Sequence, residues 1–150
     1  MVDKKKQGKK NRQTGAAWER KIRKDLKDKC YLVIKNPNNV FWDEDNVNKP
    51  PEERTGVFDQ ARAKFNPFTK SMMMMSGGFP DFIAFKPGDW KNIGVEAKIN
   101  GYLDPEERAK CDFLLHEHIL SKILIASKDK NKRGKIIYKE YENKENGLRI

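Results

Sequence analysis

The chain has 150 residues, a length that suits one domain with a sizeable core and is short for two. Lys and Arg number 32 against 22 Asp and Glu, which leaves a formal net charge of +10 at pH 7. Such a surplus attracts polyanions such as nucleic acid, although a basic composition by itself also fits a merely soluble protein.

The cysteine and hydropathy patterns exclude several classes of protein. Cys30 and Cys111 stand alone in the sequence, which excludes a CxxC zinc pattern and a disulfide framework and favours a cytoplasmic, intracellular location. The basic N-terminus lacks the apolar run of a secretory signal. The run Met72–Met75 is too short to cross a bilayer, so no membrane role is expected.

The first 30 residues divide into two parts. Residues 1–13 are polar and basic with no apolar period, and we expect them to form a disordered arm. Residues 14–150 are expected to form a single domain. Thr14 can cap a helix that runs to Lys29, with Trp18, Ile22 and Leu26 as its buried stripe. Glu19 is predicted to project close to that stripe.

A short strand and an insertion follow. Tyr31–Ile34 is apolar and β-rich, and the polar segment 36–39 after it predicts a turn. Residues 38–78 are too many for a featureless loop, so they form a predicted insertion. Its apolar residues between Val57 and Phe65 are compatible with a short helix.

The second half of the chain has clearer elements. Strands are predicted over residues 79–85 and 93–99, joined by the turn Pro87-Gly88-Asp89. Asp104-Pro105-Glu106-Glu107 opens a helix that extends to about Leu120. Strands over 123–126 and 136–138 complete an α/β fold in the order α-β-(insertion)-β-β-α-β-β.

Three charged residues in the middle of the two predicted strands indicate a site. If the strands pair as a hairpin, Asp81 and Glu96 lie side by side, and such carboxylates repel unless a cation lies between them. Mg²⁺ suits oxygen ligands and accepts phosphate oxygens as well. Lys98 is two residues after Glu96, so its ammonium is expected on the same face, where it can orient or help to deprotonate a water.

Pro80-Asp81 followed by Glu96-Ala97-Lys98 resembles the motif of the PD-(D/E)xK nuclease superfamily. Glu19 within Gly15-Ala16-Ala17-Trp18-Glu19-Arg20 is similar to the helix-borne Glu of archaeal Holliday junction resolvases and VRR-type nucleases. Residues 101–108 also resemble the helix opening of those nucleases, with Glu107 at a position that commonly holds Gln. The resemblance covers roughly residues 14–40 and 77–127.

The resemblance implies a restriction-endonuclease-like mixed β-sheet flanked by helices and a metal-dependent DNA endonuclease that hydrolyses phosphodiester bonds. It implies catalytic roles for Glu19, Asp81, Glu96 and Lys98. Mg²⁺, with Mn²⁺ as a substitute, would be held by Asp81, Glu96 and the Ala97 carbonyl. Glu19 and Glu107 are further candidate ligands, and Glu107 is alternatively only part of a capping box.

The expected partner is DNA, with no small-molecule cofactor, and we leave open whether the chain forms a homodimer. The candidate DNA-binding residues are Lys4, Lys5, Lys6, Lys9, Lys10, Arg12, Lys128, Lys130, Lys132 and Arg133. A structure-selective enzyme for Holliday junctions or other branched DNA in recombination and repair is the leading expectation. The alternatives are a restriction-type or nicking nuclease and a basic DNA-binding module that does not cut.

Overall fold

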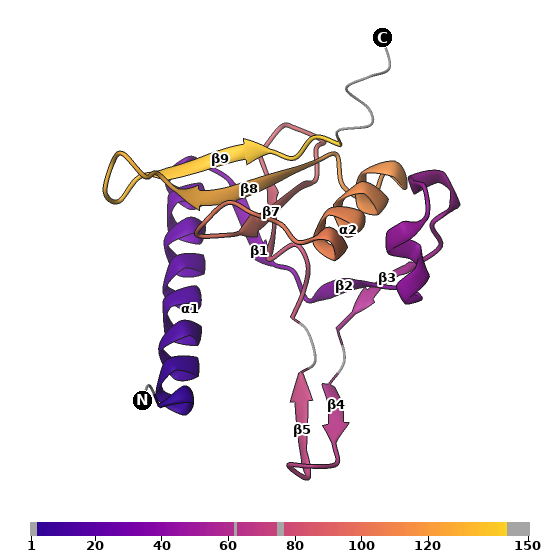
Figure 1. Ribbon diagram of the computed structural model, residues 1–150. Helices are drawn as coiled ribbons and strands as arrows, with labels where there is room; N and C mark the ends of the chain where they lie inside the picture. Colours follow the sequence, from indigo (N-terminus) through magenta and orange to yellow (C-terminus); the bar gives the residue numbers. More distant parts are fainter. Residues whose placement is uncertain (1–2, 62, 75–76, 144–150) are drawn as a thin grey trace.

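The computed structural model describes residues 3–61, 63–74 and 77–143, and its α/β fold contains a mixed five-stranded sheet and two α-helices (Figure 1). Its elements are α1 (Lys4–Asp28), β1 (Leu32–Lys35), β2 (Asn38–Phe41), η1 (Glu44–Asn48), η2 (Pro51–Glu53), β3 (Val57–Gln60), β4 (Ala63–Asn66), β5 (Ser71–Met74), β6 (Phe82–Phe85), β7 (Ile93–Ala97), α2 (Pro105–His116), β8 (Lys122–Lys128) and β9 (Ile136–Glu140). The predicted order of helices and strands outside the insertion is confirmed.

The large sheet has the strand order β1-β6-β7-β8-β9. β7 and β8 are parallel and are connected by the crossover helix α2. The other three strand pairs in this sheet are antiparallel. In the β6–β7 hairpin Phe82 pairs with Val95 and Ala84 with Ile93. The start of β6 therefore lies beside the end of β7, which is where the predicted acidic residues stand.

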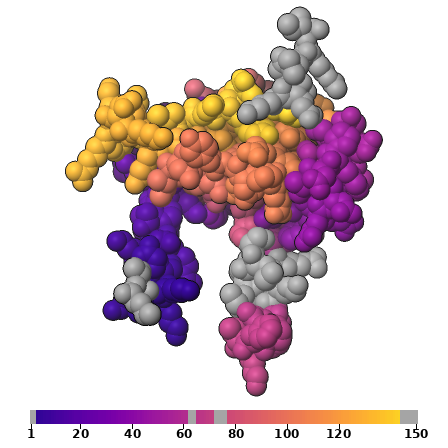
Figure 2. Space-filling view, viewed as in Figure 1, coloured from indigo at the N-terminus to yellow at the C-terminus, as the bar shows by residue number. Residues whose placement is uncertain are grey.

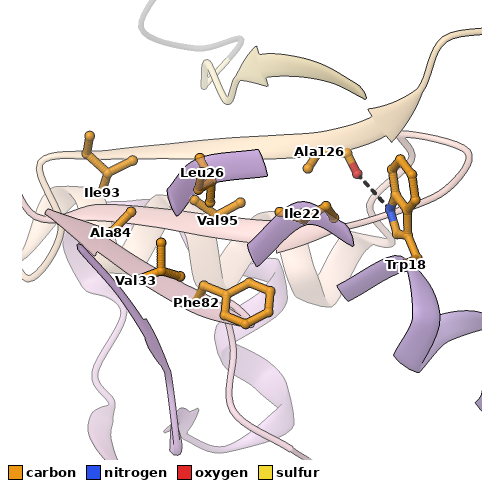
Figure 3. Close-up of a cluster of buried hydrophobic side chains, with 9 residues drawn as sticks. All are labelled: Trp18, Ile22, Leu26, Val33, Phe82, Ala84, Ile93, Val95 and Ala126. Atoms are coloured by element: carbon orange, nitrogen blue, oxygen red, sulfur yellow. Dashed lines mark hydrogen bonds between the residues drawn. The ribbon is translucent and has the colours of Figure 1, made fainter. Parts of the chain in front are cut away.

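One face of the sheet packs against α1 (Figure 3). The stripe of Trp18, Ile22 and Leu26 is buried against side chains of β1, β6, β7 and β8, namely Val33, Phe82, Ala84, Ile93, Val95 and Ala126. The indole N–H of Trp18 donates a hydrogen bond of 3.3 Å to the Ala126 carbonyl, which fixes the helix against the sheet. This cluster confirms the stripe predicted from the four-residue spacing.

The other core cluster involves α2 and part of the insertion. Phe113 and Leu114 of α2 pack with Ile123 and Ile125 of β8 and with Val40 of β2. Trp42, which follows β2, meets the ring of Phe113 edge-on at 5.5 Å between centroids. The insertion thus contributes to the core on the α2 side.

The prediction of a disordered arm over residues 1–13 is wrong for the described residues 3–13. Asp3 caps α1, its carboxylate accepting from the Lys5 N–H at 3.0 Å, and the helix continues without a break past Thr14. Thr14 is therefore not a cap, and its hydroxyl donates instead to the Lys10 carbonyl. Extending a helix that is already nucleated costs little, and Lys, Gln and Arg are good helix formers.

The insertion contains β-ribbons where a short helix was predicted. β2 pairs with β3, β4 pairs with β5, and the residues from Val57 to Phe65 lie partly on β3 and β4. Met75, Ser76 and Arg62 lie outside the described residues. Within the described ranges, no helix combines the length and apolar character that crossing a bilayer would require.

Candidate active site

Asp81 is positioned by a buried polar network just before β6. Asn36, which is 1 % exposed, donates its backbone N–H to the Asp81 carbonyl at 3.0 Å and its side-chain amide to the Pro80 carbonyl at 2.8 Å. Asn36 thus supports the backbone of Asp81. The turn predicted over 36–39 is wrong for its second half, because Asn38 and Asn39 begin β2 and pair with β3.

The carboxylates of Asp81 and Glu96 each accept a hydrogen bond from a backbone N–H on the other side of the β6–β7 hairpin. The Asp81 N–H donates to Glu96 Oε2 at 3.1 Å, and the Ala97 N–H donates to Asp81 Oδ2 at 2.8 Å. The second oxygen of each carboxylate faces a lysine at a longer distance. Asp81 Oδ1 lies 3.9 Å from Lys35 Nζ, and Glu96 Oε1 lies 3.9 Å from Lys98 Nζ.

The two carboxylates are electrostatically undercompensated. Burial raises the pKa of Asp81, and the charge of Glu19 adds to this effect while the Ala97 N–H and Lys35 oppose it. Burial raises the pKa of Glu96 well above its ordinary value, and the neighbouring charge of Asp81 raises it further. Only 8 % of the Glu96 side chain is exposed, so solvent screens this repulsion poorly.

Lys98 extends from the end of β7 to α2. Its Nζ donates a hydrogen bond to Glu107 Oε1, while Glu107 Oε2 accepts from the Asp104 N–H at 2.9 Å. Burial alone would lower the pKa of Lys98, but the hydrogen bond to Glu107 and the nearby negative charges outweigh it and raise the pKa. Lys98 is therefore an ammonium at neutral pH, which suits orienting a water or stabilising negative charge and does not suit accepting a proton.

Of the two predicted alternatives for Glu107, the capping box is confirmed. Glu107 forms the complete capping box of α2 with Asp104, and its other oxygen is engaged by Lys98. Both carboxylate oxygens are thus in use, so this arrangement assigns Glu107 to capping α2 and holding Lys98. The role of Glu107 as a metal ligand stays a prediction.

Glu19 projects from α1 toward the same end of the sheet, where it meets a lysine that the sequence analysis missed. Lys35 Nζ lies 2.6 Å from Glu19 Oε2 as well as 3.9 Å from Asp81 Oδ1. Lys35 is the last residue of β1 and pairs with Phe82. Nothing in the local sequence marks it, because its position depends on the pairing of β1 with β6.

The donor set fits a hard divalent cation at Asp81 and Glu96. The partly buried Asp81, just before β6, and the buried Glu96 of β7 have raised pKa values. Each has one oxygen that is not held by a backbone N–H of the hairpin. In the part of the chain that the structure describes, no group of three Asp, Glu, His or Cys side chains converges into a metal site. A cation here would therefore rely on these two carboxylates, the Ala97 carbonyl and water.

A cleft of about 380 Å³ opens between α1 and the segment after β7, where Glu19 and Lys98 line it and the two carboxylates do not. It is lined by Gly15, Trp18 and Glu19 of α1 and by residues 97–100 after β7. Lys128, one of the predicted DNA-binding residues, lies with its Nζ 5.6 Å from the centroid of the Trp18 ring. The six basic candidates between Lys4 and Arg12 are exposed on the part of α1 that precedes the cleft, and Lys130, Lys132 and Arg133 are exposed in the β8–β9 turn.

Replacing Lys35 should strengthen divalent-cation binding. We expect Lys35→Met to tighten Mn²⁺ binding roughly fivefold, because a charge pair about 4 Å apart in water is worth about 1 kcal/mol. Isothermal titration of the protein without DNA measures this affinity directly. Lys86→Met removes an exposed lysine at the far end of β6 and should leave the affinity unchanged. Equal affinities of wild type and Lys35→Met would contradict the idea that the ammonium competes with the cation.

The structure brings Asp81, Glu96 and Lys98 together at one end of the sheet. Glu19 is connected to them through Lys35, which contacts both Glu19 and Asp81. Asn36 and Lys35 are the residues of this arrangement that sequence reasoning did not find. No family model, curated protein or solved structure matches the chain. The chemistry of the site is therefore argued from its own residues.

Proposed function

We propose that this protein is a metal-dependent DNA endonuclease with a restriction-endonuclease-like fold. The observation that carries the proposal is the pair of carboxylates formed by the partly buried Asp81 and the buried Glu96, with raised pKa values and with Lys98 directly after β7. A pair of acids that would gain by binding a cation, next to a fixed ammonium, is suited to hydrolysis of a phosphodiester.

Asp81, Glu96 and the Ala97 carbonyl would hold Mg²⁺, which would lower the pKa of the attacking water and offset the charge that builds on the phosphate. The chain's own residues supply the remaining functions. Lys98 presents an ammonium that can donate to the attacking water or to a phosphate oxygen. Glu107 holds the ammonium of Lys98 in place through a hydrogen bond. The ion pair of Glu19 and Lys35 forms the edge of the site on the side of α1.

The charge distribution supports nucleic acid as the substrate. The exposed part of α1 before the cleft carries Lys4, Lys5, Lys6, Lys9, Lys10 and Arg12, all within the first turns of the helix. Basic side chains in this arrangement can follow a phosphate backbone without reading bases. A substrate held by them would lie next to the cleft that Glu19 and Lys98 line.

A cleavage panel tests the proposal. Linear duplex, nicked duplex, a three-way fork and a four-way junction are each incubated with the protein in Mg²⁺, in Mn²⁺ and in chelator. We expect metal-dependent cleavage with a preference for the branched substrates. Intact substrates under every condition would exclude the nuclease and favour a basic DNA-binding module. Cleavage of linear duplex at particular sequences would favour a restriction-type enzyme, and cleavage confined to one strand would favour a nicking enzyme.

A further inference from the structure

The β4–β5 hairpin ends in an exposed aromatic residue that the proposed chemistry does not use. Phe68 lies in the turn between the two strands and is 95 % exposed. The turn around it is ordered by side chains: Asn66 Oδ1 accepts from the Phe68 N–H at 2.9 Å, and the hydroxyls of Thr69 and Ser71 lie 2.8 Å apart. The tip therefore presents an apolar ring to solvent on an ordered turn.

The hairpin is joined to the body at the network that positions Asp81. On the side before β4, the Ala61 N–H donates to the Pro37 carbonyl at 2.9 Å. On the side after β5, Asn39 donates its amide to the Gly77 carbonyl at 2.8 Å, and the Phe79 N–H donates to the Asn38 carbonyl at 2.8 Å. Asn36 in the same segment holds Pro80 and Asp81. The hairpin is thus joined to the body beside Asp81, the proposed catalytic acid.

The N-terminal part of α1 forms a second projection next to the hairpin. Figure 2 shows the N-terminal part of α1 and the β4–β5 hairpin extending from the same side of the body with open space between them. The α1 projection carries the basic residues from Lys4 to Arg12. Residues 63–74 of the hairpin include Lys64 and Lys70 and no acidic residue. Both projections are therefore positively charged.

We propose that Phe68 is a wedge that stacks on bases at a branch or fork of the DNA held between these two projections. This inference rests on the proposed function and assigns the element that recognises the unpaired bases of the substrate. Aromatic side chains stack on any base once it is unstacked from its neighbours, and apolar wedges separate base steps in known complexes. Inserting a ring into an intact duplex must first unstack a base step, so such a ring contributes more to binding where the duplex is already interrupted.

Charge and position favour DNA over a membrane as the occupant. An exposed Phe near two lysines would also suit an anionic lipid surface. The hairpin, however, is anchored next to Asp81, and the lysine-bearing part of α1 extends on the same side, so a flat bilayer would have to contact two separate projections and span the open space between them. A nucleic acid held between the projections would reach the site.

Binding measured in chelator separates this inference from catalysis. Fluorescence anisotropy gives the affinities of the full chain for a forked DNA and for a blunt duplex of the same length and sequence. We expect wild type to prefer the fork, and Phe68→Ala to lose roughly tenfold in affinity for the fork while keeping its affinity for the duplex. Trp90→Ala is the matched control. Trp90 is 98 % exposed in the β6–β7 turn, at the end of the β6–β7 hairpin that is far from Asp81.

Three results would overturn the inference: equal affinity of wild type for fork and duplex, equal loss in Phe68→Ala and Trp90→Ala, or loss in Phe68→Ala that is the same for both DNAs. Binding to vesicles of phosphatidylserine and phosphatidylcholine that depends on Phe68, with unchanged fork affinity, would assign the tip to a membrane instead. A Phe68-dependent fork preference without any cleavage would support the wedge and exclude the nuclease. Cleavage without that preference would support the nuclease and exclude the wedge.

Discussion

Glu96→Gln is expected to abolish cleavage and at the same time to raise the melting temperature of the metal-free protein. The variant removes one of two carboxylates that would hold Mg²⁺, for which we expect a loss of roughly a thousandfold in rate. It also relieves the repulsion with Asp81 in a buried position, while a Gln oxygen can still accept from the Asp81 N–H. Melting in chelator should rise by a few degrees, since each kcal/mol is worth about 2–4 °C in a chain of this size.

The pH dependence of stability gives the same variant a second test. The pKa of Glu96 is raised in the folded protein, so the folded state binds more protons than the unfolded chain. Wild-type stability in chelator should therefore fall as the pH rises from the ordinary Glu pKa of 4.5 through the raised value, and Glu96→Gln should lose this part of the decline. The effect of Asp81 has the same sign and remains in the variant.

Glu106→Gln is the control for these experiments, because its side chain is 60 % exposed on α2 and pairs only with a lysine one turn away among the contacts described. It should retain cleavage, melting temperature and the upward shift of melting that Mg²⁺ produces. Glu96→Gln should lose that shift. Identical melting of wild type and Glu96→Gln, with and without Mg²⁺, would refute a cation site at the carboxylate pair.

Lys98→Ala should reduce cleavage by roughly a hundred- to a thousandfold and leave DNA binding nearly unchanged. Lys98 is a single ammonium held by Glu107 and lying 3.9 Å from Glu96 Oε1, so it can act on a reacting phosphate and is a minor part of a +10 surface. Single-turnover cleavage and anisotropy in chelator measure the two effects separately. Loss of binding in proportion to cleavage would assign Lys98 to substrate binding.

Two further variants identify how Lys98 acts. Lys98→Met keeps the apolar stem and removes the charge, so it should be as inactive as Lys98→Ala. Glu107→Gln should reduce cleavage less, because it loosens the ammonium without removing it. Since the pKa of Lys98 is raised, the wild-type rate should show no lysine titration near neutral pH. A rate that rises through neutral pH in wild type and not in Lys98→Met would instead make this lysine a base.

Local sequence patterns predicted the parts of this molecule that depend on neighbouring residues. The alternation around Glu96, the turn at residues 87–89 and the acidic residue at 81 were enough to place Asp81 beside Glu96 across a hairpin. Trp18, Ile22 and Leu26 gave the buried face of α1, and Asp104 to Glu107 gave the capping box. In each case the interaction joins residues that the period of a strand or helix already relates.

The remaining features depend on contacts between distant segments. Lys35 reaches Glu19 and Asp81 because β1 pairs with β6, and Asn36 supports Asp81 across more than forty residues of insertion. The strands of the insertion are four residues long, which is too short for their apolar period to be told from that of a helix. The N-terminal helix has no apolar stripe before Gly15, so hydropathy gave no sign of it.

The buried asparagines of the segment 36–39 have a practical consequence for redesign. They join the projecting hairpin to the body on one side and fix the backbone of Asp81 on the other, and Gly78 packs so closely on the Asn36 carbonyl that a methyl group would not fit. The turn from Pro67 to Lys70 lies beyond this junction. Under the proposed function, we expect an exchange of its sequence to alter which nucleic-acid shape is bound, while Asp81 and Glu96 stay where they are.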